Sequence, residues 1–261
     1  MTVFPRPRLL SPILKLLLTV GAVCLIWQAV ISSMRIPAYL VPSPGQVAQA
    51  FLTEWRRLVE STGYTLTSAG LGICVSTTIA IALAALGRVN RNVDEALAPL
   101  VIVFRSMPVT AIAPIIMLAF GRSIATGVVV VTIVSFFPIF VNLKRGLAGA
   151  DANAEQLFHV YDASGIQRLR MLHFPQALPF LFAGLRVAGG SAILGAMLSE
   201  WLTGLRGLGN LILESGEMRE ISLLWAAVIT SVFFGLSVFW ATSAGERRVL
   251  HWKQRSSAQP D

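Results

Sequence analysis

Charged residues are scarce in this sequence, and their scarcity excludes a large water-soluble domain. Only 13% of the 261 residues are Asp, Glu, Lys or Arg, and 55% are hydrophobic, whereas soluble domains carry about 25% charged residues. The mean hydropathy is +0.70. A soluble protein of this length needs a far more polar surface, so the lipid bilayer is the simpler solvent for this chain.

Cysteine is nearly absent as well, which excludes a disulfide framework and a cysteine-rich zinc centre. Cys24 and Cys74 both lie inside apolar runs, where we expect inert thiols. His159, His173 and His251 show no metal-ligand spacing with cysteine or acidic residues. We therefore predict no metal site, and we expect the histidines at the surface or at an interface.

A phosphate-binding loop is also missing. Such a loop needs a Gly-Lys pair, but Lys15, Lys144 and Lys253 each follow Leu or Trp, and the glycine-rich stretch 204–210 contains no lysine. The net charge of +8 comes from residues scattered between apolar runs, with no basic face or nucleic-acid motif. We predict no catalytic residue, no cofactor and no nucleic-acid partner.

Six apolar stretches are long enough to cross a bilayer, which takes about 20 residues in a helix. They cover residues 13–32, 64–87, 97–120, 123–143, 177–202 and 223–244. The stretch 97–120 contains Pro108 and Pro114, which we expect to kink it. No small-residue cleavage site follows the first stretch, so we interpret it as a retained anchor. The sequence predicts an all-α membrane protein with one transmembrane domain over residues 1–261.

The distribution of basic residues predicts the orientation of the chain. With the N-terminus inside, 13 of the 21 Lys and Arg fall on the inner side and 6 on the outer side, while Arg105 and Arg186 lie within spans. Because positive charge is enriched on the cytoplasmic side of membrane proteins, we predict that both termini are cytoplasmic.

Residues 44–60 have the periodicity of a helix outside the apolar spans. Val47, Phe51, Trp55 and Leu58 recur on one face. Two interpretations stay open: an interfacial helix lying on the periplasmic surface, or a helix packed on the transmembrane bundle.

Residues 152–174 form a polar, helical elbow between two apolar stretches. Ala154, Leu157, Phe158 and Tyr161 recur at helical spacing. Residues 162–165 have turn chemistry, and Ser164 with Gln167 has the spacing of a capping box that starts a second short helix. We expect Pro175 to end that helix. The apolar row needs a partner surface, either the bundle itself or a cytoplasmic protein.

This elbow resembles the cytoplasmic loop of binding-protein-dependent ABC importer permeases. In "GADANAEQLFHVYDASGIQRLRMLHFPQALPFLFAGLR", Gln156, Leu157 and Phe158 take the Glu-Ala-Ala positions of the family signature. Asp162 replaces the family glycine. Asp adopts left-handed conformations more easily than most residues, so this substitution is allowed. "WQAVISSMRIPAYLVPSPGQVAQAF", "VFRSMPVTAIAPIIMLAFG", "SFFPIFVNLKRGL" and "SEWLTGLRGLGNLIL" extend the resemblance over residues 27–252, to permeases of the nitrate, sulfonate and taurine type.

The resemblance implies a type I ABC importer permease in the bacterial plasma membrane. It implies a second permease subunit, with a homodimer expected, two cytoplasmic ATPase subunits that bind ATP and Mg, an extracytoplasmic solute-binding protein, and surrounding membrane lipid. The expected ATPase-coupling residues are Gln156, Leu157, Phe158, Tyr161, Asp162, Ala163, Ser164, Gly165 and Arg168. The expected solute is a small anion such as a sulfonate, taurine or nitrate, with a pyrimidine vitamin precursor as the alternative.

Four residues are candidates for the translocation pathway or gate: Arg105, Pro108, Arg186 and Glu200. The two arginines either face the pathway or extend to the cytoplasmic interface. Glu200 either forms an ion pair or contacts solute near the outer gate, or is solvated at the interface. A membrane enzyme would need clustered acids or a nucleophile with its base, and a passive channel would not need the elbow. Both alternatives fit the sequence less well than a permease.

Overall fold

The computed structural model describes residues 12–249, apart from the side chains of Pro12, Ile13, Leu16, Leu100 and Arg105. Every regular element in this range is a helix. In chain order they are α1 (Pro12–Met34), α2 (Pro44–Thr53), α3 (Trp55–Val89), α4 (Arg91–Ser106), α5 (Val109–Phe120), α6 (Ile124–Ala148), α7 (Ala152–Val160), α8 (Gly165–Arg168), the π-helix η1 (Leu169–His173), α9 (Phe174–Thr203), α10 (Leu208–Glu217) and α11 (Ile221–Val249). This confirms the all-α fold class predicted from the sequence.

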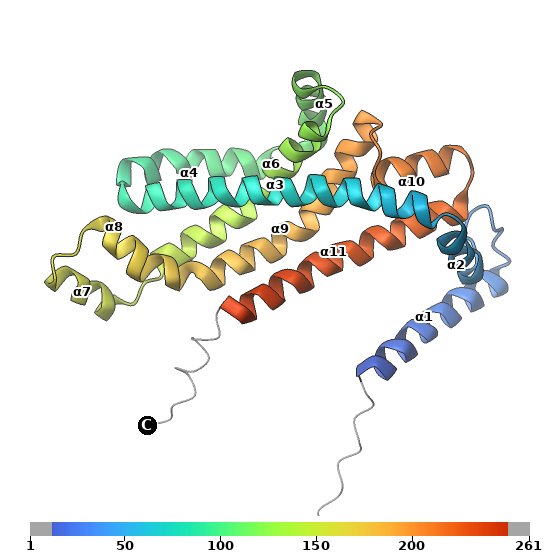
Figure 1. The fold of residues 1–261 in the computed structure, drawn as a ribbon, viewed down its shortest axis with the longest axis horizontal. Helices are drawn as coiled ribbons and strands as arrows, with labels where there is room; N and C mark the ends of the chain where they lie inside the picture. Colours follow the sequence, from blue (N-terminus) through green and yellow to red (C-terminus); the bar gives the residue numbers. More distant parts are fainter. Residues whose placement is uncertain (1–11, 250–261) are drawn as a thin grey trace, which may run out of the picture.

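The long helices α3, α6, α9 and α11 run side by side as the body of the molecule (Figure 1). The helix α6 packs against both α3 and α9, and α11 packs on the other side of α9. In one half of the bundle the core is built around Phe136, Phe140 and Leu143 of α6. In the other half, α2, α3, α10 and α11 share a second apolar core around Leu58, Leu211 and Leu223.

Small residues allow α6 and α9 to approach closely. Gly184, Ala188, Ala192 and Ala196 recur along α9, and all four are buried. A Cβ added at Gly184 would lie 2.9 Å from the Cα atom of Ile139, a separation that Cβ atoms do not tolerate. The stripe of small residues therefore packs against the neighbouring helix within the same chain, as small residues do at membrane helix contacts.

The apolar stretch 97–120 is not one continuous helix, contrary to the prediction of a single kinked span. The chain leaves the helical conformation at Met107 and Pro108, with ψ angles of 115° and 99°, and α4 and α5 are bent by 102° at this break. A proline disfavours the helical conformation of the residue before it, which accounts for the extended Met107. Pro114, in contrast, lies inside α5 without ending it.

Among residues 12–249, five helices are long and apolar enough to cross a membrane, or six if α4 and α5 form one broken span. This agrees with the expected number of about six. The first of them, α1, diverges from the bundle (Figure 1) and exposes most of its length. Its Trp27 ring lies 5.3 Å from the ring of Trp225 on α11.

The helix predicted over residues 44–60 ends earlier. It stops at Thr53, and the residues from Trp55 onward already belong to α3. Ser43 caps α2 with a complete capping box. Val47 packs in the core shared with α11. Trp55 is exposed, although it lines a surface hollow together with Phe51 and Leu58. The structure thus shows α2 packed on the bundle.

Candidate functional site: a helical elbow at one end of the bundle

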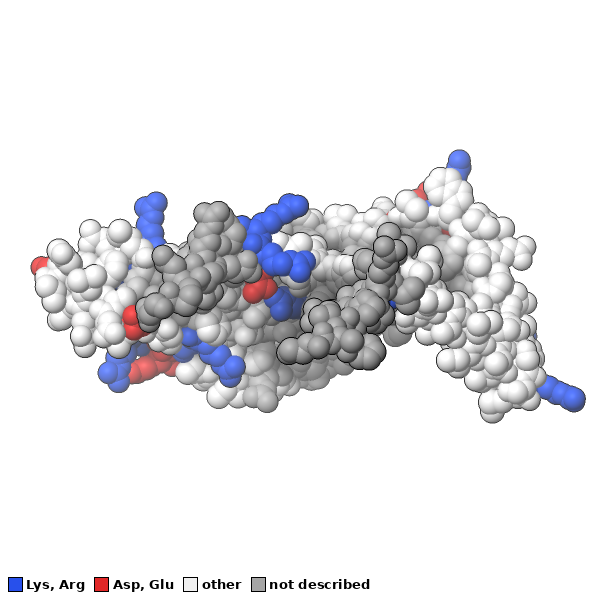
Figure 2. Space-filling view, turned by 90° about the horizontal axis from the view of Figure 1, so that it is seen from below, with Lys and Arg blue, Asp and Glu red and all other residues white. Residues whose placement is uncertain are grey.

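The elbow segment, residues 152–174, lies at one end of the bundle, and α2 and α10 lie at the opposite end (Figure 1). It consists of α7, α8 and η1, which connect α6 to α9. Most of the Lys and Arg seen in Figure 2 lie over the half of the molecule that carries this segment. The elbow segment therefore lies at the more basic end of the face of the molecule that Figure 2 shows.

Helix α7 begins and ends with local polar chemistry. The Asp151 carboxylate accepts a hydrogen bond from the Asn153 backbone N–H at 3.3 Å. At the other end Asp162 has φ = 50°, its N–H donates to the His159 carbonyl, and the Ala163 N–H donates to the Phe158 carbonyl, both over 3.0 Å. These bonds form a Schellman motif, in which the left-handed residue is usually glycine. Asp162 thus adopts the conformation that the family glycine adopts most easily.

The predicted capping box at Ser164 is present. Its hydroxyl accepts from the Gln167 N–H at 3.3 Å, and the Gln167 side chain accepts from the Ser164 N–H at 2.8 Å. The expectation that Pro175 ends this helix is wrong, because the chain stays helical from Gly165 through Thr203. The π-helix η1 lies just before Pro175 and widens the turn in which the proline supplies no N–H. The helix therefore continues beyond Pro175.

The outer side of the elbow segment is an exposed apolar surface with a groove. The side chains of Leu157 and Tyr161 are 56% and 78% exposed. A cavity of about 260 Å³ lies between the two halves of the segment, lined by Leu157, Phe158, Tyr161, Ala163, Gln167 and Met171. The structure therefore brings four of the nine predicted coupling residues to one groove, namely Leu157, Phe158, Tyr161 and Ala163. Within the described chain the side chains of Leu157 and Tyr161 stay exposed there.

The inner side of the elbow segment carries a polar cluster that the sequence analysis missed. Glu155 of α7 lies 3.6 Å from Arg88 of α3, 3.6 Å from Arg168 of α8 and 3.3 Å from the Nε2 atom of His173. His173 is 2% exposed, so the expectation of a surface histidine is wrong for this residue. Arg88 is 67 positions from Glu155 in the chain, and no local spacing pattern connects them.

The structure describes the surroundings of three of the four predicted pathway residues, Arg186, Pro108 and Glu200. Arg186 of α9 forms an ion pair with Glu246 of α11 and lies over the ring of Phe239, so its charge is balanced inside the chain. Pro108 lies at the break between α4 and α5. The side chain of Arg105 lies outside the described part of the structure.

Glu200, the fourth of these residues, is buried rather than solvated at an interface. It is 3% exposed, and its Oε2 atom accepts from the Gly209 N–H at 2.8 Å and from the Thr65 hydroxyl at 3.1 Å. The Leu208 N–H donates to the Thr65 hydroxyl at 2.9 Å. Glu200 and Thr65 together bind the first N–H groups of α10, which otherwise have no partner within the helix.

Glycine is required beside this carboxylate. A Cβ added at Gly207 would lie 2.1 Å from the Glu200 Cδ atom, and one at Gly209 would lie 2.3 Å from the Met197 carbonyl oxygen. The other end of α10 is held by Arg57, which pairs with Glu214 at 3.6 Å and with Glu220 at 3.1 Å. The stretch 204–210 thus turns the chain back so that α10 packs against α9 and α3.

No group of three or more His, Cys, Asp or Glu residues with metal-binding geometry occurs among residues 12–249. The elbow segment thus has an exposed apolar groove on its outer side and a polar connection to the bundle on its inner side.

Comparison with known proteins identifies relatives over almost the whole chain. It is 30% identical to a "Probable ABC transporter permease protein" of Haemophilus influenzae, over 90% of this chain and 94% of the relative. It is 30% identical to the "Riboflavin transport system permease protein RibX" of Chloroflexus aurantiacus, over 96% of both chains. It is 32% identical to the "Formylaminopyrimidine transport permease protein ThiX" of Halalkalibacterium halodurans, over 83% of this chain and 87% of the relative.

Relatives of lower identity include the "Putative aliphatic sulfonates transport permease protein SsuC" of Bacillus subtilis, at 23% over 92% of this chain and 88% of the relative. The "Nitrate import permease protein NrtB" of a Synechocystis strain is 28% identical over 66% of this chain and 62% of the relative. These named transport systems carry chemically different solutes.

The fold matches a solved chain of the MetNI methionine ABC transporter in an inward-facing conformation. The TM-score is 0.61 at 18% identity, over 74% of this chain and 94% of the other. Residues 76–251 match the model of the family "Binding-protein-dependent transport system inner membrane component". The chain therefore belongs to this family of multi-pass inner-membrane proteins, which are the permease subunits of ABC importers and not enzymes.

Proposed function

We propose that the exposed groove of the elbow segment is the surface on which an ATPase subunit docks. The observation that carries this proposal is the exposure of Leu157 and Tyr161 around a cavity of about 260 Å³ at the end of the bundle. An apolar groove with a polar surround is a typical surface for a partner helix or loop. ATP and Mg bind to the ATPase and not to this chain.

The connections of the elbow segment give the mechanism. It follows α6 after a short link and continues through η1 directly into α9. Closure of two ATPase subunits displaces the segment, and the displacement tilts α6 and α9, which pack against each other over their length. Such a rigid-body change switches access to the pathway from one side of the membrane to the other.

In this proposal the elbow segment and both termini are cytoplasmic, and the end with α2 and α10 is periplasmic. The excess of Lys and Arg on the inner side supports this orientation. Two copies of the chain form the pathway as a homodimer, with one ATPase for each elbow segment, and an extracytoplasmic solute-binding protein delivers the solute at the α2 and α10 end.

The first candidate solute class is a small anion such as a sulfonate, nitrate or taurine. Relatives named for sulfonate and nitrate transport support it. The net charge of +8 also supports it. The pairing of Arg186 with Glu246 weakens it, because this arginine no longer offers a free positive charge.

The second candidate is a heteroaromatic vitamin or vitamin precursor. The relatives named for formylaminopyrimidine and riboflavin transport have higher identities, 32% and 30% over most of the chain. Stimulation of ATP hydrolysis in the reconstituted importer, tested with alkanesulfonates, taurine, nitrate, formylaminopyrimidine and riboflavin, distinguishes the two classes.

The docking assignment is tested with the double variant Leu157→Asp/Phe158→Asp. We expect normal insertion, loss of co-purifying ATPase and uncoupling of ATP hydrolysis from uptake, because two carboxylates cannot be buried in an apolar contact. The matched control is Met218→Asp, an exposed apolar residue at the opposite end of the bundle, which should retain the ATPase. Normal ATPase binding and uptake by the double variant would refute the assignment.

A further inference from the structure

One carboxylate on the inner side of the elbow segment contacts basic side chains from three other elements. Glu155 of α7 faces Arg88 from α3, Arg168 from α8 and His173 from η1. Its side chain is 31% exposed, and those of Arg168 and Arg88 are 33% and 37% exposed. A single exposed ion pair contributes little, but this one carboxylate joins four elements at a half-buried junction.

His173 restricts the geometry of this cluster. Its Nε2 atom lies 3.0 Å from Arg88 Nη2 and 3.3 Å from Glu155 Oε2. The Nε2 atom has one role at a time: it either accepts from Arg88 or donates to Glu155. Both groups nevertheless lie within hydrogen-bond or ion-pair distance of this atom. The three side chains therefore form one connected contact between α3 and the elbow segment.

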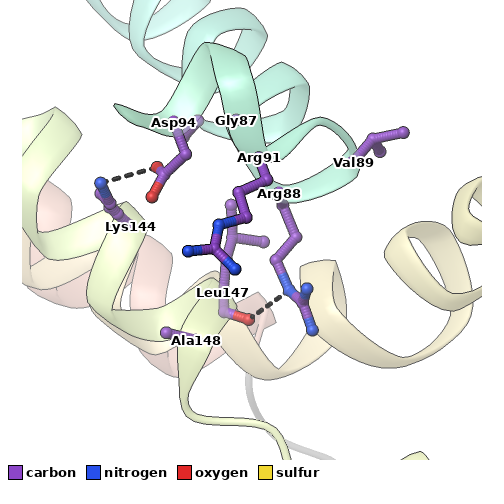
Figure 3. Close-up of a pocket in the computed structure, with 9 residues that line it drawn as sticks. Gly87, Arg88, Val89, Arg91, Asp94, Lys144, Leu147 and Ala148 are labelled. Atoms are coloured by element: carbon purple, nitrogen blue, oxygen red, sulfur yellow. Dashed lines mark hydrogen bonds and ion pairs between the residues drawn. The ribbon is translucent and has the colours of Figure 1, made fainter. Parts of the chain in front are cut away.

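Arg88 also ties the end of α3 to the end of α6. Its Nε–H donates to the Leu147 carbonyl at 3.3 Å, and nearby Lys144 of α6 pairs with Asp94 of α4 at 2.6 Å (Figure 3). A cavity of about 470 Å³ lies beside this turn, lined by Arg88, Arg91 and Lys144 among others. The polar contacts of Arg88 and Lys144 border this space, and they add to the apolar core that contains Ala84 of α3 and Leu97 of α4.

From this arrangement we propose that Glu155 and Arg88 are positioning residues that fasten the elbow segment to the end of α3. The consequence is that α3 and the start of α4 move together with the elbow segment when the ATPase subunits close. The segment is connected covalently to α6 and α9, and α3 packs against both of these helices. The cluster adds a direct contact between the segment and the end of α3. The proposal rests on the proposed function, in which the elbow segment binds the ATPase.

Cysteine cross-linking tests whether the two elements stay together. A Cβ added at Gly165, the first residue of α8, lies 3.9 Å from the Val89 Cγ1 atom at the end of α3. The sulfur of a cysteine at position 89 would take about the place of that Cγ1 atom, so the two side chains are close enough to test for a disulfide. The variant Val89→Cys/Gly165→Cys is made with Cys24 and Cys74 replaced by serine, co-expressed with its ATPase and purified as the complex. Disulfide formation is followed with and without ATP, Mg and vanadate.

We expect the cross-link to form at the same rate in both nucleotide states. The oxidised complex should hydrolyse ATP at the rate that the same variant shows before oxidation, so that any effect of the cysteine at position 165 itself cancels. With Glu155→Gln added, we expect cross-linking in the vanadate state to slow about fivefold, the effect of one ion-pair contribution. The matched control is Glu95→Gln, which removes the exposed pair with Arg91 on the same turn and should behave as the parent. Arg88→Gln supplies a second test if the Glu155 variant does not insert.

Each result separates the two proposals. If the parent cross-link is lost with ATP and vanadate, if cross-linking abolishes ATP hydrolysis, or if Glu155→Gln and Arg88→Gln both match the parent, the fastening role is wrong while the docking assignment survives. If the ATPase does not co-purify with the unaltered chain, the proposed function fails, and the role of Glu155 fails with it.

Discussion

The hydroxyl of Thr65 on α3 lies 3.1 Å from the Oε2 atom of Glu200, and this contact joins α3 to the end of α9. The same two side chains bind the N–H groups of Leu208 and Gly209, where α10 begins. One buried carboxylate thus positions three helices at the end of the bundle opposite the elbow segment. Its role in the structure is to hold α10 in place.

Replacing Glu200 with Ala should destabilise the chain measurably. The change leaves the buried Gly209 N–H without a partner, at a cost of about 2 kcal/mol, or about 5 °C in the thermal midpoint for a chain of this size. Glu200→Gln keeps an acceptor and should lose less than half as much. Thermal unfolding in detergent measures both variants, and an unchanged midpoint for Glu200→Ala would show that the carboxylate does not anchor α10.

The variant Gly207→Ala should be destabilising through the same carboxylate. Its new Cβ would lie 2.1 Å from the Glu200 Cδ atom, so the Glu200 side chain must leave its hydrogen bonds. In the double variant Gly207→Ala/Glu200→Ala this collision is gone, and the combined loss should be smaller than the sum of the single losses by about 1 kcal/mol. Additive losses in the double-mutant cycle would contradict the contact.

Two glycines of α9 should respond in opposite directions to the same change. Gly184→Ala forces a Cβ to within 2.9 Å of the α6 backbone and should cost about 2 kcal/mol through overpacking. Gly190 has no atom within 4 Å of its added Cβ, so Gly190→Ala should stabilise by about 0.5 kcal/mol through helix propensity. Equal effects in thermal unfolding would argue against the close contact between α6 and α9.

The pair of Arg186 and Glu246 should be more sensitive to removal of one partner than of both. Both side chains are more than two-thirds buried, so Glu246→Ala leaves an unbalanced charge and should cost about 1 to 2 kcal/mol. The double replacement Arg186→Met/Glu246→Met should recover part of that loss in the same unfolding assay. A double variant less stable than Glu246→Ala would mean that the ion pair itself is strongly stabilising.

The sequence predicted the features that depend on neighbouring residues. The capping box of Ser164 and Gln167 and the left-handed Asp162 arise within a few residues, and the structure contains both. The extent of the helix at 44–60 was wrong, because the chain leaves the helix at Glu54 inside an otherwise periodic stretch. In 97–120 the interruption lies at Pro108, one of the two prolines expected to kink the stretch, and it is a full break rather than a kink. Periodicity alone carries no information on where a helix breaks.

Contacts between distant parts of the chain could not be predicted in the same way. Glu155 meets Arg88 and Glu200 meets Thr65 only because α3 lies beside α6 and α9. The sequence left Glu200 open between a contact at the outer gate and solvation at the interface, and it placed His173 at the surface or at an interface. In the structure both side chains are buried with polar partners. Reasoning from one sequence finds the apolar face of a helix, but it does not show which other helix packs against that face.

The most direct test of the docking assignment is site-specific photocross-linking in the assembled importer. A photoreactive residue at Tyr161 is compared with one at Met218, which is similarly exposed at the other end of the bundle. The account predicts an adduct with the ATPase subunit from position 161 and none from position 218. An ATPase adduct from position 218, or its absence from position 161, would contradict the assignment of the elbow segment as the ATPase-binding surface.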